Sequence, residues 1–451
     1  MSSYLILAHL STMELREYLK KNSFVDYNVL LTSDFAPQLS LIAPAYNEGF
    51  TIEENVKSLL SLNYNNYEVI LVNDGSKDNS MEILIKTYDL VRTKLNFHPL
   101  IETKAIKQIY TSRNAAYKKL IVVDKENGGK ADALNVGLNI AKNPYVVCID
   151  VDCILDKDSL LKLAKPFLES YGKRTIATGG VVRIANQCVI KNGRLIEVNI
   201  PDLMLPRIQV LEYLRAFLLG RMAWGRLDGL LLISGAFGAF DKEIALLSGG
   251  YDTKTVGEDM ELVVRMRRYM IENKIPYTVS YIPDPLCWTE APEEFKIFKK
   301  QRSRWMRGTI ETLSIHRKMF MNPKYKMLGI LSVPYWTFFE FMAPGIEFIG
   351  LVITAVFIIL GLLNWHLFIL LVLFVYFFAV LFSVIALYSE ERSYHKYPKH
   401  ADFLKLLLAA FIEPIYFHPL AVYAALLGYK EKIMGTKGWG EMTRKGFTKK
   451  P

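Results

Sequence analysis

Two long apolar segments near the C-terminus constrain the fold of this 451-residue chain more than any other feature. Residues 344–364 contain one ionisable side chain, Glu347, and residues 365–388 contain no acid and no lysine. About 20 apolar residues span the hydrocarbon core of a bilayer, and the helices of soluble proteins are rarely apolar on all sides. The sequence therefore predicts a transmembrane helical hairpin over residues 344–388.

The charges beyond the hairpin predict its orientation. Residues 390–400 contain Arg392, Lys396 and Lys399, and basic loops stay preferentially on the cytosolic side of a membrane. A hairpin that ends in the cytosol also begins there. We therefore expect a multi-pass protein of the inner (plasma) membrane, with everything before the hairpin in the cytosol.

A third apolar stretch, residues 403–429, contains Glu413, Pro414 and Pro419. A full crossing would bury Glu413 in the bilayer and place the basic tail outside, against the charge rule. An interfacial or re-entrant helix pair, broken at the prolines, would keep the tail inside. The second arrangement is the preferred prediction.

The N-terminal apolar run, residues 4–10, is too short to span a bilayer and has no basic region before it, so it is not a signal peptide. It either lies against the membrane or follows a span that precedes this chain. The resulting division of the chain is a membrane-proximal segment (1–37), a cytosolic domain (38–308), interfacial helices (309–343), the hairpin (344–388), a cytosolic loop with the third segment (389–429) and a basic tail (430–451).

The formal net charge of +10 is compatible with nucleic acid, anionic lipid or a phosphorylated substrate. The basic residues gather next to the apolar segments rather than along a soluble face, which argues against a nucleic-acid partner and favours membrane lipid. The four cysteines show no metal-binding spacing, so we expect reduced, packed thiols.

Short apolar strands alternate with amphipathic helices in the N-terminal half. The strands are expected at residues 39–43, 67–72, 119–123 and 145–151, and the helices at 52–62, 81–91 and 131–141. This alternation predicts an α/β domain with a parallel sheet covered on both faces. Ligands of such sheets bind at the carboxyl ends of the strands, where the polar residues of this sequence also fall.

Asp150 and Asp152 follow the last of these strands. Two carboxylates so placed can hold a divalent cation that bridges a diphosphate, although a solvated loop pair has the same spacing. Asp74 follows an earlier strand and could accept hydrogen bonds from a nucleoside, or simply stabilise a turn. Lys130 follows two glycines at the expected start of a helix, a position that favours anions.

Two further groups of residues have side chains suited to catalysis or substrate binding. Glu258 and Asp259 precede a predicted helix, where a carboxylate either caps the helix or acts as a general base in a cleft. The run 301–305, Gln-Arg-Ser-Arg-Trp, offers arginines for phosphate oxygens and an indole on which a sugar ring can stack. A basic helix at a membrane surface has the same composition.

Taken together, these residues resemble the processive, membrane-bound family-two glycosyltransferases, whose members make cellulose, hyaluronan, chitin oligosaccharides and poly-N-acetylglucosamine. The resemblance extends over residues 38–447. Its motifs, in order, are PAYNE (44–48), VNDGS (72–76), NGGKADALN (127–135), DVD (150–152), SGAFGAF (234–240), GED (257–259) and QRSRW (301–305). The tail 439–447 is similar to that of poly-N-acetylglucosamine synthases, which are the nearest subgroup.

The resemblance implies a GT-A (nucleotide-diphospho-sugar transferase) fold followed by interfacial and transmembrane helices. It also implies a UDP-sugar donor and a Mg²⁺ or Mn²⁺ ion. It assigns donor binding to Pro44, Tyr46, Glu48, Asp74, Lys130, Asp150, Gln301 and Arg304. It assigns acceptor binding to Ser234, Gly235, Glu258 and Trp305, the general base to Asp259, and the metal to Asp152 and Asp150.

The implied function is inverting, processive extension of a β-linked exopolysaccharide, most simply from UDP-N-acetylglucosamine. The partners would be the growing polysaccharide or glycolipid, membrane lipid and an accessory membrane subunit. Two alternatives remain open from the sequence: transfer of a single sugar to a polyprenyl phosphate or glycolipid, and a membrane module without enzymatic activity. Relatives usually begin with one or two membrane spans, which this chain does not show.

Overall fold

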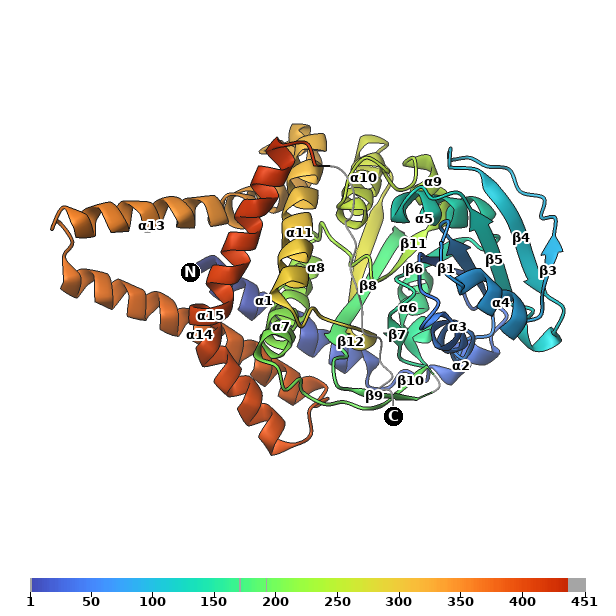
Figure 1. Ribbon diagram of the computed structural model, residues 1–451, viewed down its shortest axis with the longest axis horizontal. Helices are drawn as coiled ribbons and strands as arrows, with labels where there is room; N and C mark the ends of the chain where they lie inside the picture. The colour runs from blue at the N-terminus through green and yellow to red at the C-terminus, as the bar shows by residue number, and fades with distance from the viewer. Residues whose placement is uncertain (1, 170–171, 192, 437–451) are drawn as a thin grey trace. The chain divides into compact units, whose positions relative to one another are not determined.

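The computed structural model describes residues 2–169, 172–191 and 193–436 (Figure 1). It contains two compact units. Unit 1 holds the described residues of 1–17, 199–229 and 291–436, and unit 2 holds those of 18–198 and 230–290. The sequence assigned residues 38–308 to one cytosolic domain. The structure instead groups two parts of that range, residues 199–229 and 291–308, with the C-terminal helices.

Unit 2 is built on one large sheet. Its strand order within the described residues is β3-β4-β5-β2-β1-β6-β11-β8-β12-β7. The strands are β1 Leu39–Ala45, β2 Tyr67–Asn73, β3 Leu90–Thr93, β4 Ile106–Ser112, β5 Leu120–Lys125, β6 Tyr145–Ile149, β7 Ile154–Leu155, β8 Arg174–Ile184, β11 Phe237–Asp241 and β12 Tyr277–Thr289. A separate antiparallel pair joins β9, Val189–Lys191, to β10, Arg194–Glu197.

Helices lie on both faces of this sheet (Figure 1). They are α2 Asn28–Thr32, α3 Ile52–Leu60, α4 Ser80–Thr87, η1 Ala115–Tyr117, α5 Lys130–Ile140, α6 Ser159–Leu168, α9 Lys242–Leu247 and α10 Glu258–Glu272. The central strands are apolar and almost fully buried, which explains why their sequences read as continuous hydrophobic runs. The predicted α/β class and the four predicted strands are confirmed.

The sheet is mixed rather than purely parallel, which corrects the prediction. Strands β5, β2, β1 and β6 are parallel neighbours, as expected. At one edge, β3 and β4 run antiparallel, and β11 lies antiparallel between β6 and β8. The helix expected at 81–91 ends at Thr87, because the chain turns at Asp89, with φ of 46°, and enters β3.

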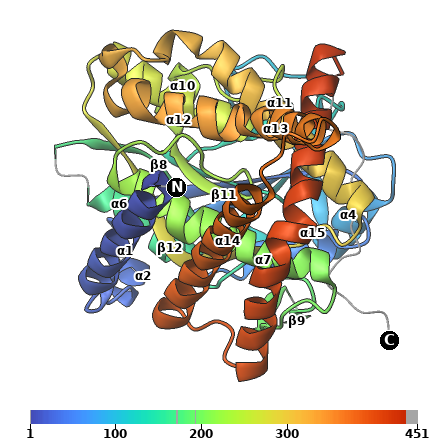
Figure 2. The ribbon, with the colours of Figure 1, turned by 90° about the vertical axis from the view of Figure 1, so that its left-hand side faces the viewer.

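Unit 1 is helical in its described residues. It contains most of α1 (Ser2–Asn22), α7 Met204–Leu214, η2 Arg215–Arg221, α8 Met222–Arg226, α11 Phe295–Ile315, η3 Arg317–Met319, η4 Pro323–Tyr325, η5 Leu328–Ser332, α12 Val333–Tyr335, η6 Trp336–Phe341, α13 Ala343–Ile359, α14 Trp365–Ser393 and α15 His400–Ile433. Helices α7 and α11 both pack against α15 (Figure 2), which is why they belong to this unit and not to the sheet.

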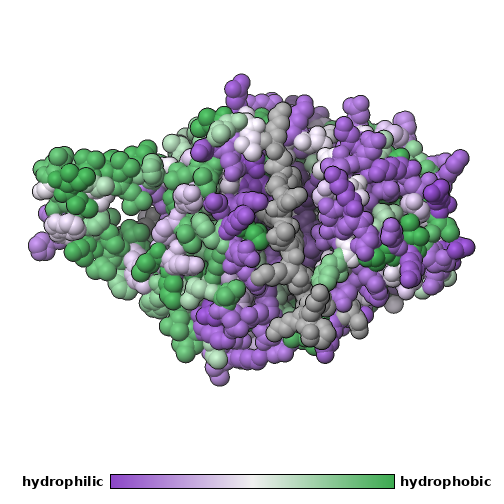
Figure 3. All heavy atoms as spheres, viewed as in Figure 1, coloured by the Kyte–Doolittle hydropathy of each residue, from purple (hydrophilic) through white to green (hydrophobic). Residues whose placement is uncertain are grey.

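Helices α14 and α15 are long and apolar enough to cross a membrane. A third span is possible if residues Leu328–Phe341 and α13, which meet at a bend of 40°, form one broken crossing. Hydrophobic side chains gather over α13 and α14 (Figure 3). The two helices of the predicted hairpin are therefore present, joined by a short turn at Gly361, where φ is 65°.

Helix α15 corrects the prediction for residues 403–429. It runs without a break from His400 to Ile433 and includes both Pro414 and Pro419. Neighbouring side chains can satisfy backbone groups that a proline leaves without a partner. The Tyr376 hydroxyl of α14 donates to the Phe411 carbonyl at 2.9 Å, one residue after the Ala410 carbonyl that Pro414 leaves without its usual helical donor.

The Glu413 carboxylate of α15 is buried, as a full crossing would require, and it is paired. It accepts hydrogen bonds from the Arg215 guanidinium of η2 and from the Ser383 hydroxyl of α14. A buried charge with these partners avoids the cost of an isolated carboxylate. The predicted basic tail lies mostly in residues 437–451, outside the described residues, and so does the motif at 439–447.

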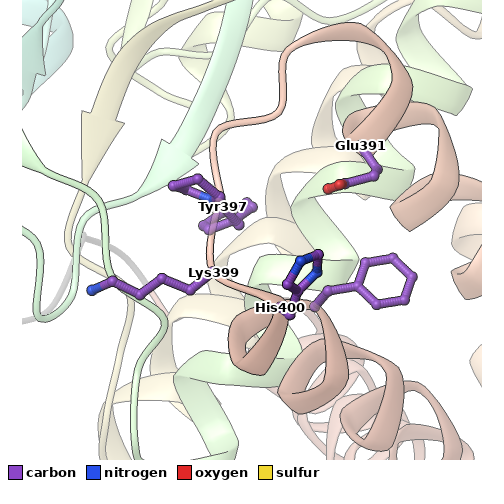
Figure 4. A pocket seen from close by; sticks show the side chains of 6 residues that line it. Glu391, Tyr397, Lys399 and His400 are labelled. Carbon is purple, nitrogen blue, oxygen red and sulfur yellow. The ribbon is translucent and has the colours of Figure 1, made fainter.

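A cavity of about 220 Å³ opens at the connection between α14 and α15 (Figure 4). Glu391, Tyr397, Lys399 and His400 line it together with Pro398 and Phe403. None of the site residues predicted from the sequence belongs to this lining.

Candidate functional site

The carboxyl ends of the parallel strands in unit 2 bring several predicted residues to one edge of the sheet. Ala45 at the end of β1 pairs with Asn73 at the end of β2, and the Asp74 amide donates to the Ala45 carbonyl at 2.9 Å. The following loop carries Tyr46, which is 44% exposed, and Glu48. Pro44 is the second-to-last residue of β1 itself.

Asp74 is the centre of a buried group that we call the Asp74 network. Its Oδ1 accepts from the Lys125 ammonium at 2.6 Å and from the Gly128 amide at 2.9 Å. Its Oδ2 accepts from the Gly129 amide at 2.8 Å and from the Asn127 side chain at 3.2 Å. The Asp74 carboxylate therefore fixes the glycine loop that precedes α5. Its predicted contact with the nucleoside stays a prediction.

Lys125 and Asp132 complete the Asp74 network, and sequence reasoning missed both. The Lys125 ammonium, whose side chain is fully buried, also pairs with the Asp132 carboxylate at 2.6 Å. Lysine is almost never fully buried without a charged partner. The available signal was a lysine at the end of an apolar strand, directly before the Glu-Asn-Gly-Gly loop, with Asp132 inside the following motif.

The glycine loop places Lys130 as the first residue of α5, as predicted. Gly129 precedes it with φ of 88°, a conformation that favours glycine, and forms the N-cap of the helix. The Lys130 ammonium lies 2.5 Å from Asp150 Oδ1 and 3.6 Å from Glu258 Oε1. It also donates to the Gly235 carbonyl at 3.4 Å.

The Gly235 amide donates to Asp259 Oδ2 at 2.9 Å, which links the predicted general base to the same group. We call Lys130, Asp150, Gly235, Glu258 and Asp259 the Lys130 cluster. It joins four of the seven sequence motifs within unit 2.

The sheet topology explains how these distant segments meet. Strand β11 runs antiparallel to β6, with Phe237 opposite Ile149, so the residues before β11 lie beside those after β6. The Asp150 amide accordingly donates to the Ala236 carbonyl at 3.3 Å. Ser234 and Gly235 therefore reach the edge of the sheet where the parallel strands end.

Acidic groups dominate the electrostatics of the cluster. Glu258 is 2% exposed, and the neighbouring Asp152 is 8% exposed. Burial would lower the pKa of Lys130, but the carboxylates of Asp150, Glu258 and Asp259 outweigh it and raise that pKa. Lys130 is thus a stable cation among several carboxylates.

The donor set fits a hard divalent cation that a substrate helps to bind. Asp150 and Asp152 offer two carboxylates in one loop, and oxygen ligands are those that Mg²⁺ and Mn²⁺ prefer. Among the described residues, no group of three or more His, Cys, Asp or Glu side chains is arranged to hold a metal. A cation here would need further oxygen ligands, such as those of a diphosphate.

The remaining predicted residues, Gln301, Arg304 and Trp305, lie on α11 in unit 1. Their neighbour Arg302 forms a two-point ion pair with Glu212 of α7, at 2.7 and 2.5 Å. The Arg302 guanidinium also lies 4.1 Å from the centre of the Trp305 ring, and the indole is 41% exposed. The predicted contacts of these residues with donor and acceptor stay predictions.

Comparison with known families decides the identity of the chain. The model for glycosyl transferase family group 2 matches residues 145–382, and that for glycosyl transferase family 2 matches residues 40–98. The chain belongs to glycosyl transferase family group 2. The matched residues include the loops that carry Asp74 and Asp150 and the segments that carry Asp259 and Trp305.

The curated relatives of this family-group-2 chain include two poly-beta-1,6-N-acetyl-D-glucosamine synthases. That of Staphylococcus epidermidis is 30% identical over 276 residues, which cover 61% of this chain and 55% of the relative. That of Staphylococcus aureus (strain COL) is 30% identical over 305 residues, which cover 67% of this chain and 60% of the relative. The chain therefore matches somewhat more than half the length of these relatives.

Among solved structures, a mannosyltransferase of Pyrobaculum calidifontis in complex with GDP-Man and Mn²⁺ has a TM-score of 0.52. It is 16% identical, and the match covers 96% of this chain and 99% of that chain. The similarity confirms the predicted GT-A-type fold.

Proposed function

We propose that this chain is the catalytic part of an inverting, processive glycosyltransferase that extends a β-linked exopolysaccharide from a UDP-sugar, in the first place UDP-N-acetylglucosamine. The Lys130 cluster is the observation that carries the proposal. It joins a candidate base, Asp259, to a candidate diphosphate site at Asp150 through Gly235 and Lys130. The similarity to poly-beta-1,6-N-acetyl-D-glucosamine synthases supports the choice of sugar.

In the proposed reaction, Asp259 accepts the proton of an acceptor hydroxyl while that oxygen attacks the anomeric carbon of the donor. The bond between this carbon and the phosphate oxygen breaks, UDP leaves, and the configuration at the carbon inverts. One displacement of this kind needs no covalent sugar–enzyme intermediate. Bound Mg²⁺ or Mn²⁺, held by Asp150 and Asp152, would supply charge neutralisation for the departing diphosphate.

The chain's own residues have complementary roles in this proposal. The Asp74 network holds the glycine loop, so that the first turn of α5 presents Lys130 and its backbone amides to the diphosphate. Gln301 and Arg304 would bind the same diphosphate, and Trp305 would stack against the acceptor sugar. Pro44, Tyr46 and Glu48 would line the nucleoside side, and Ser234 and Glu258 the acceptor side.

We also propose that the enzyme lies in the inner membrane with unit 2 in the cytosol, where UDP-sugars are made. The apolar helices α14 and α15 support membrane insertion. The same proposal includes an accessory membrane subunit and export of the product.

The test is a donor panel with the purified full chain in lipid nanodiscs. UDP-N-acetylglucosamine, UDP-glucose and GDP-mannose are supplied with Mg²⁺ or Mn²⁺, and the products are sized and their linkages determined. A β-linked polymer from UDP-N-acetylglucosamine is expected. A lipid carrying one sugar would refute processivity, and a polymer from another donor would refute the sugar.

A further inference from the structure

We propose that Lys130 is an internal counter-ion of the metal-binding carboxylates, which keeps a divalent cation from binding tightly until the donor's diphosphate accepts the lysine. The inference rests on the proposed function in one respect: the ligand that displaces Lys130 from Asp150 is a nucleoside diphosphate. It concerns the order in which cation and donor bind, not the chemistry of transfer.

Lys130 occupies an oxygen that a bound cation would need. The Lys130 ammonium lies 2.5 Å from Asp150 Oδ1. A divalent cation bound to a carboxylate oxygen sits about 2.0–2.2 Å from it, which would bring the cation and the ammonium into strong mutual repulsion. A cation on Oδ1 would replace the ammonium, and a cation on Oδ2 of the same carboxylate would still lie within a few ångströms of it, so each positive group weakens the binding of the other.

The surroundings of Lys130 are acidic and shielded from water. Asp150 and Glu258 lie close to the Lys130 ammonium, and the backbone at Gly235 connects the lysine to Asp259. The side chains of Lys130 and Glu258 are mostly shielded from water, with 14% and 3% of their surfaces exposed, so charges interact strongly here.

The donor's diphosphate offers the Lys130 ammonium another anionic partner. Lys130 is the first residue of α5, where the helix N-terminus already favours an anion, and its four-carbon side chain can change rotamer. A diphosphate at this end would take the ammonium from Asp150 and would bring oxygen ligands for the cation. Each charged group would then have a partner both before and after the donor binds.

The experiment measures Mn²⁺ binding to the full chain in detergent micelles without any nucleotide. Electron paramagnetic resonance reports the free Mn²⁺ concentration directly. We expect Lys130→Met, which removes the charge but keeps the apolar length, to bind Mn²⁺ at least about tenfold more tightly than the wild type. A second titration with saturating UDP should tighten Mn²⁺ binding strongly in the wild type and much less in Lys130→Met.

Two matched variants distinguish direct competition from a general change in charge. Lys130→Arg keeps the cation at the same position and should bind Mn²⁺ as weakly as the wild type. Lys254→Met removes an equal charge from an exposed position four residues before Glu258 and should leave Mn²⁺ binding unchanged. Thermal unfolding of each variant, without metal, shows whether it is folded.

Unchanged Mn²⁺ affinity in Lys130→Met, or an equal rise in Lys254→Met, would overturn the inference. So would a UDP effect of the same size in Lys130→Met and the wild type. Because the first titration contains no sugar nucleotide, its result does not depend on the donor panel. Tighter binding by Lys130→Met together with an inactive donor panel would leave the counter-ion role standing and refute the proposed synthase.

Discussion

The Asp74 network and the Lys130 cluster lie at the same edge of one sheet, yet their charges are balanced differently. In the Asp74 network each carboxylate oxygen of Asp74 accepts from two protein groups, and Lys125 is fully buried between two acids. In the Lys130 cluster one ammonium faces several carboxylates, and its side chain is partly exposed.

The difference separates a scaffold from the proposed reaction site. A buried, fully hydrogen-bonded group resists change and sets the geometry of the loop that it holds. A partly exposed group with an excess of one charge gains stability when ligands of the opposite charge arrive. Both groups pair a lysine with acidic side chains beside glycine amides, so the residue types alone do not distinguish them.

The largest expected effect tests the chemistry of the Lys130 cluster. Asp259→Asn should lower kcat by about 10²–10⁴-fold, because the amide cannot accept the acceptor's proton. UDP binding, measured by calorimetry, should change little, since Asp259 bonds to Gly235 and not to the predicted donor residues. Glu272→Gln, at the opposite end of α10, serves as the control, and polymer synthesis at the wild-type rate by Asp259→Asn would refute the assigned base.

The second effect compares the two lysines directly. Lys125→Met leaves Asp74 and Asp132 buried without their cation and should lower the free energy of unfolding by about 3–5 kcal/mol. Lys130→Met should cost roughly half of that or less, because Asp150, the carboxylate nearest to Lys130, is 27% exposed and stays partly hydrated. Chemical denaturation measures the free energy of unfolding of both variants. Equal losses of this free energy would show that the contrast between the two groups is wrong.

The smallest effect concerns Asp78, in the loop that follows Asp74. Its carboxylate accepts from Ser80 and from the Gly49 amide at 2.9 Å. Burial opposes ionisation of Asp78, but these hydrogen bonds outweigh it and hold its pKa below the ordinary value of 3.8.

Because the pKa of Asp78 is lower in the folded state, its ionised carboxylate stabilises the fold above pH 3.8. This contribution is lost as the pH falls below 3.8 and through the lower pKa of the folded state. Asp78→Asn should therefore cost about 1 kcal/mol at pH 7, and the difference from the wild type should shrink toward pH 3. Denaturant unfolding across this range measures it, with Glu82→Gln, an exposed acid on α4, as the reference. A difference that grows toward low pH would contradict the sign.

Much of the fold could be predicted from local patterns. The strands β1, β2, β5 and β6 and the start of α5 at Lys130 follow from apolar runs and glycine positions. The antiparallel strands β3 and β11 could not be predicted in this way, because their pairing depends on partners far away in the sequence. The continuity of α15 through two prolines could not be predicted either, because α15 packs along its length against distant helices, α11 and α14 among them.

The membrane segment shows the same division for a charged residue. Glu413 appeared from the sequence to argue against a full crossing, because an isolated carboxylate is costly in a bilayer. The structure pairs it with Arg215, almost 200 residues earlier in the chain, and with Ser383. Hydropathy could not reveal that partner, since it lies in a segment that the sequence assigned to the cytosolic domain.

The sequence by itself determined the chemistry that is available: the acids at the strand ends, the glycine loop before Lys130 and the apolar helices. These features are local, because backbone conformation and hydropathy depend on near neighbours. Only the tertiary structure decided which charges face one another. It joined Asp74 to Lys125 in a closed scaffold and Lys130 to Asp150 in an open cluster, because pairing between distant strands and helices sets those distances.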